Sequence, residues 1–88
     1  MFYVYVLFSQ KDKKLYIGQT NDLTGRLGLH NAGKVKATKN RIPLKLVGCK
    51  TYETRNEARW VEYNLKHHSD KKKKFLKELC LEQKEVKP

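Results

Sequence analysis

Hydrophobic and polar positions alternate along the first twenty residues and predict two adjoining β-strands. Each strand face of residues 2–8 carries its own apolar set: Phe2, Val4, Val6 and Phe8 on one face, and Tyr3, Tyr5 and Leu7 on the other. A polar segment of hairpin length follows at residues 9–13, and residues 14–20 resume the alternation. Strands joined so closely pair antiparallel. We therefore expect Tyr5 and Tyr16 to share a face once the register is known.

A helix signal follows the hairpin. Asn21 or Asp22 is suited to cap a helix that ends near Ala32, just before Gly33. Gly25 and Gly28 lie inside it, and each weakens a helix by about 1 kcal/mol relative to alanine. This helix is therefore expected to depend on tertiary packing.

The second half of the chain predicts one more strand and two more helices. Residues 44–52 are typical of a strand, and Thr54-Arg55-Asn56-Glu57 matches the capping box that opens a helix. This helix is expected to end near His67, with an apolar stripe of Ala58, Val61 and Leu65. Ser69 or Asp70 is expected to cap a last helix whose buried face carries Phe75, Leu76, Leu79 and Cys80.

The length of 88 residues allows a single domain with a thin core. We expect it to cover residues 1–82, with residues 83–88 as a frayed tail. No apolar run approaches the ~20 residues that cross a bilayer, and no signal-peptide pattern opens the chain. These features predict a cytoplasmic protein without membrane association. Cys49 and Cys80 form no C-x-x-C pair, which favours thiols over a zinc site or a disulfide.

The charge of the chain indicates the kind of partner it binds, because 20 Lys and Arg against 9 Asp and Glu give a formal net charge of +11. The excess is concentrated in residues 31–55, which favours a nucleic-acid partner. Candidate phosphate contacts in this segment are Lys34, Lys36, Lys39 and Arg41. A solvated loop is the alternative. The run from Lys71 to Lys74 opens a helix, where it is equally suited to an outside anion or to solvent.

Five side chains have the chemistry of phosphodiester hydrolysis: Tyr5, Tyr16, Arg26, His30 and Glu62. Each also has a structural alternative. The tyrosines suit half-buried strand positions, and Arg26 with His30 suits a solvated helix face. Glu62 has Lys66 four residues later as an ion-pair partner.

The order of these residues resembles the GIY-YIG nuclease superfamily along essentially the whole chain. Tyr3-Val4-Tyr5 stands at the Gly-Ile-Tyr position, and Tyr16-Ile17-Gly18 matches the second half of that motif. Residues 19–31 resemble the family's helix with its arginine and histidine, and residues 57–66 resemble the later helix with its glutamate. The similarity is greatest to small, single-domain, largely uncharacterised bacterial members. It implies an α/β (α+β) domain built on a three-stranded antiparallel sheet with flanking helices.

The resemblance also implies an endonuclease that hydrolyses nucleic acid, DNA in preference to RNA, with one Mg²⁺ or Mn²⁺ ion. Glu62 would hold the metal, and Arg26 would stabilise charge on the scissile phosphate. Tyr5 and Tyr16 would position or deprotonate the attacking water, assisted by His30. A binding module that cleaves little is the main alternative, and an interaction domain recruited to a repair or mobile-element partner is another. A monomer and a weak dimer both fit the sequence.

Trp60 has two interpretations, a partly buried packing position and a platform on which a base stacks. We favour packing, and we leave Tyr52 and Tyr63 out of any stacking surface. His67 and His68 are expected at a helix end, where they favourably meet the helix dipole without a catalytic role.

Overall fold

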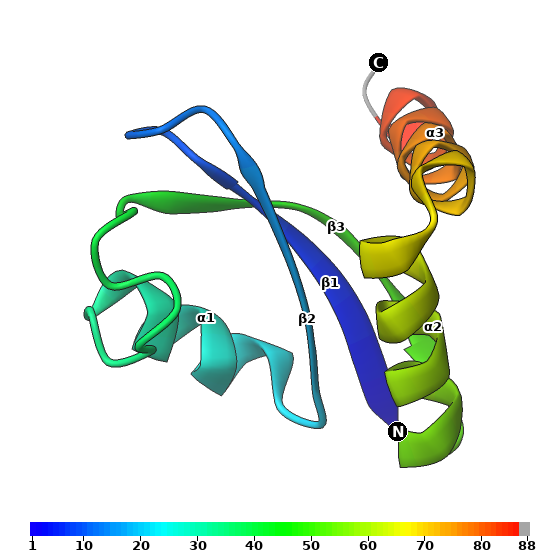
Figure 1. Cartoon of the computed structure of the whole chain (residues 1–88), viewed down its shortest axis with the longest axis horizontal. Coiled ribbons are helices and arrows are strands. Elements are labelled where there is room, and N and C mark those ends of the chain that lie inside the picture. Colours follow the sequence, from blue (N-terminus) through cyan, green and yellow to red (C-terminus); the bar gives the residue numbers. More distant parts are fainter. Residues whose placement is uncertain (87–88) are drawn as a thin grey trace.

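A three-stranded antiparallel sheet lies at the centre of the fold, with β1 between β2 and β3. A computed structural model describes residues 1–86 and, within them, the side chains of residues 1–79. The elements follow in the order β1 (Phe2–Ser9), β2 (Leu15–Thr20), α1 (Leu23–Asn31), β3 (Leu44–Tyr52), α2 (Arg55–His67) and α3 (Ser69–Val86) (Figure 1). The predicted fold class and the third strand are confirmed. No helix of the described chain is long and apolar enough to cross a membrane.

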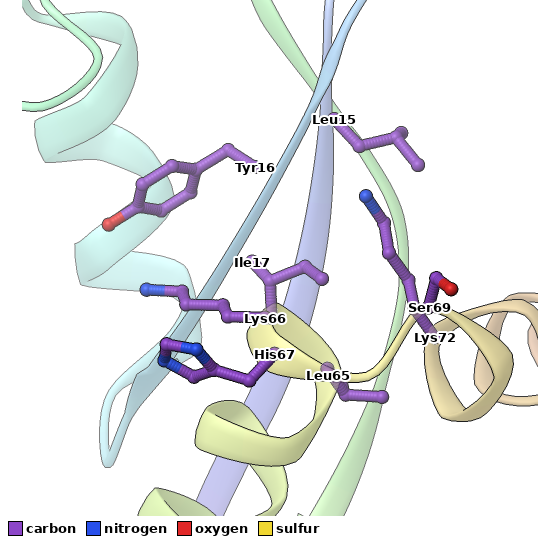
Figure 2. Close-up of a pocket in the computed structure, with 8 residues that line it drawn as sticks. All are labelled: Leu15, Tyr16, Ile17, Leu65, Lys66, His67, Ser69 and Lys72. Carbon is purple, nitrogen blue, oxygen red and sulfur yellow. The ribbon is translucent and has the colours of Figure 1, made fainter.

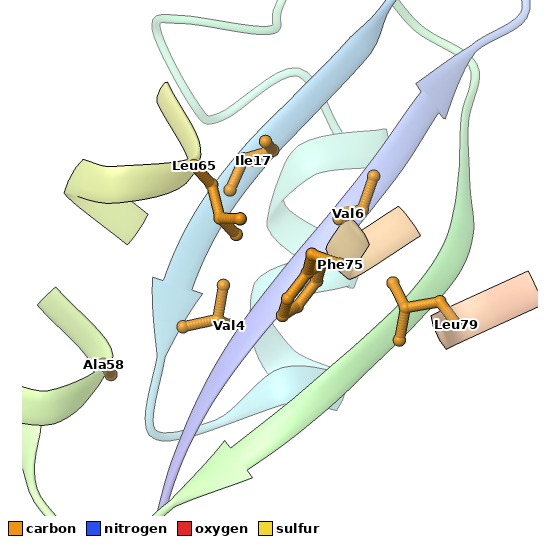
Figure 3. Close-up of a cluster of buried hydrophobic side chains, with 7 residues drawn as sticks. All are labelled: Val4, Val6, Ile17, Ala58, Leu65, Phe75 and Leu79. Atoms are coloured by element: carbon orange, nitrogen blue, oxygen red, sulfur yellow. The ribbon is translucent and has the colours of Figure 1, made fainter. Parts of the chain in front are cut away.

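The two faces of the sheet carry different helices. In Figure 1, α1 and the loop after it lie on one side, and α2 and α3 lie on the other. Seven buried side chains fill the α2 and α3 side (Figure 3): Val4, Val6, Ile17, Ala58, Leu65, Phe75 and Leu79. On the α1 side, Tyr5 and Leu7 pack with Leu44, and Leu23 and Leu27 of α1 cover them. The alternation of residues 2–8 therefore separates the two clusters as the sequence predicts.

The register places the two motif tyrosines on the same face. Tyr5 lies opposite Gly18 and Leu7 lies opposite Tyr16, so the tyrosines are diagonal neighbours. Their ring centroids are 6.4 Å apart. The expected shared face is confirmed, and both hydroxyl-bearing rings face the helix that carries Arg26 and His30.

Helix α1 is stabilised by a cap at its start and by contacts with β3 at its end. Asp22 caps it, because its Oδ1 accepts a hydrogen bond from the Gly25 backbone N–H at 3.1 Å. Past its end, Gly33 adopts a φ of +76°, which favours glycine. Asn31 joins the end of α1 to β3, donating to the Leu44 carbonyl at 3.0 Å and accepting from its N–H at 2.8 Å. The helix is thus held at both ends despite its two glycines.

Helices α2 and α3 follow one another almost without a break. Thr54 caps α2, accepting from the Glu57 N–H at 3.1 Å, and the helix ends at His67 as predicted. His68 alone separates the helices, and its carbonyl accepts from the Lys72 N–H at 3.1 Å. Ser69 and Asp70 consequently lie in the first turn of α3, so the predicted start of that helix was placed too late. The predicted burial of Cys80 lies outside the described side chains.

Candidate active site

A buried chain of hydrogen bonds joins the centre of the sheet to α1 and the loop after it. The Tyr5 hydroxyl lies 2.9 Å from His30 Nε2, and His30 Nδ1 lies 2.7 Å from Thr38 Oγ1. All three residues are completely buried. The alternative of a solvated helix face is therefore wrong for His30, because the end of α1 turns its imidazole inward onto β1.

Arg26 lies beside this chain at the Tyr5 end. The interaction of its guanidinium with the Tyr5 side chain raises the pKa of Arg26. Burial raises the pKa of Tyr5, and the nearby guanidinium of Arg26 opposes that effect. Burial, followed by the charge of Arg26, lowers the pKa of His30 below 6.5. Both effects favour the neutral form of His30.

The direction of the chain follows from what each group can do. A guanidinium only donates hydrogen bonds, so we infer that the Tyr5 oxygen faces Arg26 and that its proton is directed to His30 Nε2. A neutral imidazole with an accepting Nε2 carries its proton on Nδ1. We infer that His30 Nδ1 donates to Thr38.

Tyr16 lies beside this chain at the edge of the sheet. Its ring centroid is 5.3 Å from that of His30, and it is half-buried where Tyr5 is fully buried. Gly18 makes room for both tyrosines, because a Cβ there would lie 2.6 Å from the Tyr5 hydroxyl oxygen and 3.0 Å from Tyr16 Cε2. The glycine of the second motif is thus a packing requirement of the tyrosines.

Helix α2 brings Glu62 to the same edge. Lys66 Nζ lies 2.8 Å from the Glu62 carboxylate and 5.7 Å from the centroid of the Tyr16 ring. Figure 2 shows Lys66 reaching from α2 toward Tyr16 on β2, with His67 beside it. Glu62 also contributes to raising the pKa of Tyr5. The structure therefore gathers all five predicted residues, and Glu62 makes the ion pair that was its structural alternative.

Pockets open beside these groups. One of 540 Å³ includes Tyr16, Lys66, His67 and Lys72 in its lining (Figure 2). Another of 190 Å³ is lined by Arg26 and Arg55 together with Gln19 and Asn21. Within the described chain, Arg26 Nε is a buried polar atom without a hydrogen-bond partner. A cationic donor with unused capacity suits an anion in this pocket.

The side chains of this cluster can bind a metal ion only through one carboxylate, with the remaining ligands supplied by water and substrate. Glu62 is the carboxylate of this cluster, and no group of three His, Cys, Asp or Glu side chains that could hold a metal occurs among the described residues. Mg²⁺ usually keeps several waters and takes one or two carboxylates together with substrate phosphate. Glu62 fits that arrangement, provided that its carboxylate exchanges Lys66 for the metal.

The basic segment separates into two groups. Lys34, Lys36 and Lys39 are exposed, as a phosphate-binding role requires. Arg41 instead forms an ion pair with Asp12 at 2.6 Å and hydrogen-bonds the Leu15 carbonyl at 3.3 Å. It ties the loop to the β1–β2 turn, a task that competes with binding phosphate.

Three residues of this region were missed by sequence reasoning. Thr38 bonds His30 from a loop without periodicity, which gives no local signal. Arg55 reaches the Arg26 pocket from the start of α2, and the sequence gives no sign of their proximity. Spacing identifies Lys66 only as an ion-pair partner of Glu62, but its position near Tyr16 also connects α2 with β2.

Comparison with known proteins agrees with this geometry. Residues 1–75 match the GIY-YIG catalytic domain. The chain belongs to the GIY-YIG family. The UPF0213 protein YsiG of Lactococcus lactis is 40% identical over 75 residues, covering 84% of this chain and 71% of that protein. The UPF0213 protein YazA of Bacillus subtilis is 43% identical over 75 residues, covering 84% and 72%.

A solved structure shows the same GIY-YIG fold. The solution NMR structure of the UPF0213 protein BH0048 from Bacillus halodurans has a TM-score of 0.53 and 40% sequence identity. The similarity covers 90% of this chain and 85% of that one. The resemblance to small members of this nuclease family is confirmed.

Proposed function

We propose that this GIY-YIG protein is a divalent-metal-dependent endonuclease that hydrolyses phosphodiester bonds, with DNA as the preferred substrate. The buried hydrogen-bonded chain from Tyr5 through His30 to Thr38, with Arg26 beside Tyr5, carries the proposal. It fixes a cation and a set of hydroxyls next to Glu62, which are the groups that phosphate chemistry needs. Membership of a nuclease family supports the same conclusion.

Exposure divides the roles between the two tyrosines. Tyr5 and His30 are completely buried, so we assign them the task of positioning Arg26. Tyr16 is half-buried at the mouth of the 540 Å³ pocket, and its hydroxyl is the one placed to orient an attacking water. Arg26 then stabilises negative charge on the scissile phosphate, since a guanidinium matches phosphate oxygens in pairs.

Glu62 is the residue that would hold Mg²⁺ or Mn²⁺. A bound divalent ion polarises a phosphate oxygen and makes a nearby water more acidic. Lys66, released from Glu62, is close enough to Tyr16 to pair with a substrate phosphate. The carboxylate and the ammonium therefore both gain partners when substrate and metal arrive together.

One observation favours a second function, a nucleic-acid-binding module of the same fold that cleaves little. The Glu62 carboxylate is already neutralised by Lys66 at 2.8 Å, and a lysine that stays there would oppose metal binding. Metal-dependent cleavage separates the two functions.

Substitution of Glu62 tests the proposal. Glu62→Gln should lower the cleavage rate by about 10² or more in Mg²⁺, because the carboxylate that holds the metal is lost. Binding to the same DNA in EDTA should change little. Glu57→Gln is the matched control on the same helix, since glutamine also satisfies a capping box, and it should cleave as the parent does. Equal rates for Glu62→Gln and the parent would contradict the assignment of Glu62.

A further inference from the structure

An aromatic stripe runs along the outer side of α2. It consists of Trp60, Tyr63 and His67, spaced three and four residues apart so that they lie on one helix face. The Trp60 and Tyr63 rings are stacked at 6.0 Å between centroids and 10° between planes. The Tyr63 and His67 rings lie 4.2 Å apart. The three rings form one continuous surface.

This stripe is not part of the hydrophobic core. Trp60 is 65% exposed and Tyr63 is 53% exposed, whereas Ala58 and Leu65 of the same helix are buried in the cluster under α2. The prediction that Trp60 packs against the protein is therefore wrong. Adjacent exposed aromatic rings in a chain with a thin core mark a surface for interaction.

Lysines flank the stripe at both ends. Trp60 shares a pocket of 260 Å³ with Lys71 and Lys74, and His67 shares the 540 Å³ pocket with Lys66 and Lys72. The carboxylate facing the first pocket is Glu78, and it is engaged by Lys50. Exposed rings bordered by cations complement a polyanion with flat apolar faces.

We propose that the α2 aromatic stripe binds unpaired bases of single-stranded nucleic acid, an inference that rests on the proposed nuclease function and names its substrate class. Duplexes present base edges in their grooves and keep base faces inside the stack. Single strands expose those faces to aromatic rings, while phosphates meet lysines. Lys71 to Lys74, whose role the sequence left open, supplies the cations.

The stripe is of the right length and leads to the site. The seven residue-to-residue steps from Trp60 to His67 rise about 10 Å along a helix, which spans about three nucleotides at ~3.4 Å each. Glu62 lies between Trp60 and Tyr63 in sequence, and Lys66 connects it to Tyr16. Bases held on the stripe would place the next phosphate near Tyr16 and Arg26.

Trp60 reports directly on this contact because it is the single tryptophan of the chain. The experiment titrates the intact protein, in EDTA so that nothing is cleaved, with oligothymidylate or oligouridylate of about 12 nucleotides. A duplex of the same length is the comparison. We expect quenching of Trp60 fluorescence by the single strands, and tighter binding of single strand than of duplex.

Variants separate stacking from charge. Trp60→Ala should weaken binding of a labelled oligothymidylate about tenfold, whereas Trp60→Phe, which keeps a ring, should retain most of it. The salt dependence should be unchanged in Trp60→Ala, but Lys71→Ala should make the slope shallower by about 0.7. Circular dichroism of each variant checks that the exposed substitutions leave the fold intact.

The outcomes distinguish this inference from the proposed function. Unquenched fluorescence, parental affinity in Trp60→Ala, or preference for duplex would overturn the aromatic stripe as a binding surface, even if the protein cleaves DNA. Quenching and the tenfold loss support it, even if no cleavage is seen in Mg²⁺. Different affinities for oligothymidylate and oligouridylate would name the sugar that the site prefers.

Discussion

Tyr5 lies at the centre of the site although its ring is completely buried. Its hydroxyl lies 2.9 Å from His30 Nε2 and beside the guanidinium of Arg26. Burial keeps the pKa of Tyr5 above its usual value, which favours the protonated hydroxyl. A protonated Tyr5 does not neutralise the guanidinium, as the proposed role of Arg26 toward phosphate requires.

Space for this arrangement comes from Gly18. Gly18→Ala would bring a Cβ within 2.7 Å of Tyr5 Cζ, so the buried ring must move and its bond to His30 must weaken. We expect a loss of about 1–3 kcal/mol in the free energy of unfolding, as for other overpacked cores. Urea denaturation measures this change, and the cleavage rate should fall with it.

Gly28→Ala is the control, because an added Cβ there meets nothing within 4 Å. Removing a glycine from a helix interior should increase the free energy of unfolding by about 0.5–1 kcal/mol. Equal effects of the two substitutions would mean that the Tyr5 ring adapts freely, contrary to the packing described.

At the scale of elements, the loop between α1 and β3 is fastened to the β1–β2 turn. Ser9 donates to the Arg41 carbonyl at 2.6 Å, and the Arg41 side chain pairs with Asp12. The same loop supplies Thr38 to His30. The turn therefore supports the hydrogen-bonded chain of Tyr5, His30 and Thr38 from a distance, through the backbone of the loop.

Acid should loosen this connection. Arg41 is the main cause that lowers the pKa of Asp12 from 3.8 to about 2. The folded protein thus holds the carboxylate ionised where the unfolded chain takes up a proton, so this contribution to stability is present above pH 4 and is lost as pH falls to about 2. Melting temperatures of Asp12→Asn should fall less than those of the parent across this interval. Parallel curves would show that the ion pair contributes no stability.

Local patterns and long-range contacts differ in what the sequence reveals about these elements. Strand faces, the Asp22 and Thr54 caps and the end of α2 follow from neighbouring residues, and the sequence predicts them. Arg41 and Asp12 are 29 residues apart, so no spacing rule connects them. Exposure of Trp60 was missed because an aromatic residue next to an apolar stripe is usually expected to pack against the core.

The whole molecule carries a formal charge of +11, which is expected to attract a polyanion such as nucleic acid before any specific contact forms. The loop lysines and the lysines at the start of α3 lie in parts of the fold on opposite sides of the sheet (Figure 1). A nucleic-acid strand bound along the edge formed by β2 would meet both groups of lysines, since that edge separates α1 from α2.

Replacing Lys34, Lys36 and Lys39 with alanine together should weaken DNA binding and make its salt dependence shallower by up to about 0.9 per lysine. Anisotropy titrations at several salt concentrations measure both quantities. Arg41→Ala should mainly lower the melting temperature, because Arg41 is held by Asp12. An unchanged salt slope in the triple variant would remove these lysines from the nucleic-acid interface.

We propose that this GIY-YIG site hydrolyses phosphodiester bonds with a divalent metal. Cleavage of labelled single-stranded, double-stranded and branched DNA and of RNA, in Mg²⁺, Mn²⁺ or EDTA, tests this proposal. We expect cleavage with metal, none in EDTA, and loss of cleavage in Glu62→Gln. Binding without cleavage of any substrate in either metal would rule out the nuclease and would establish the protein as a binding module.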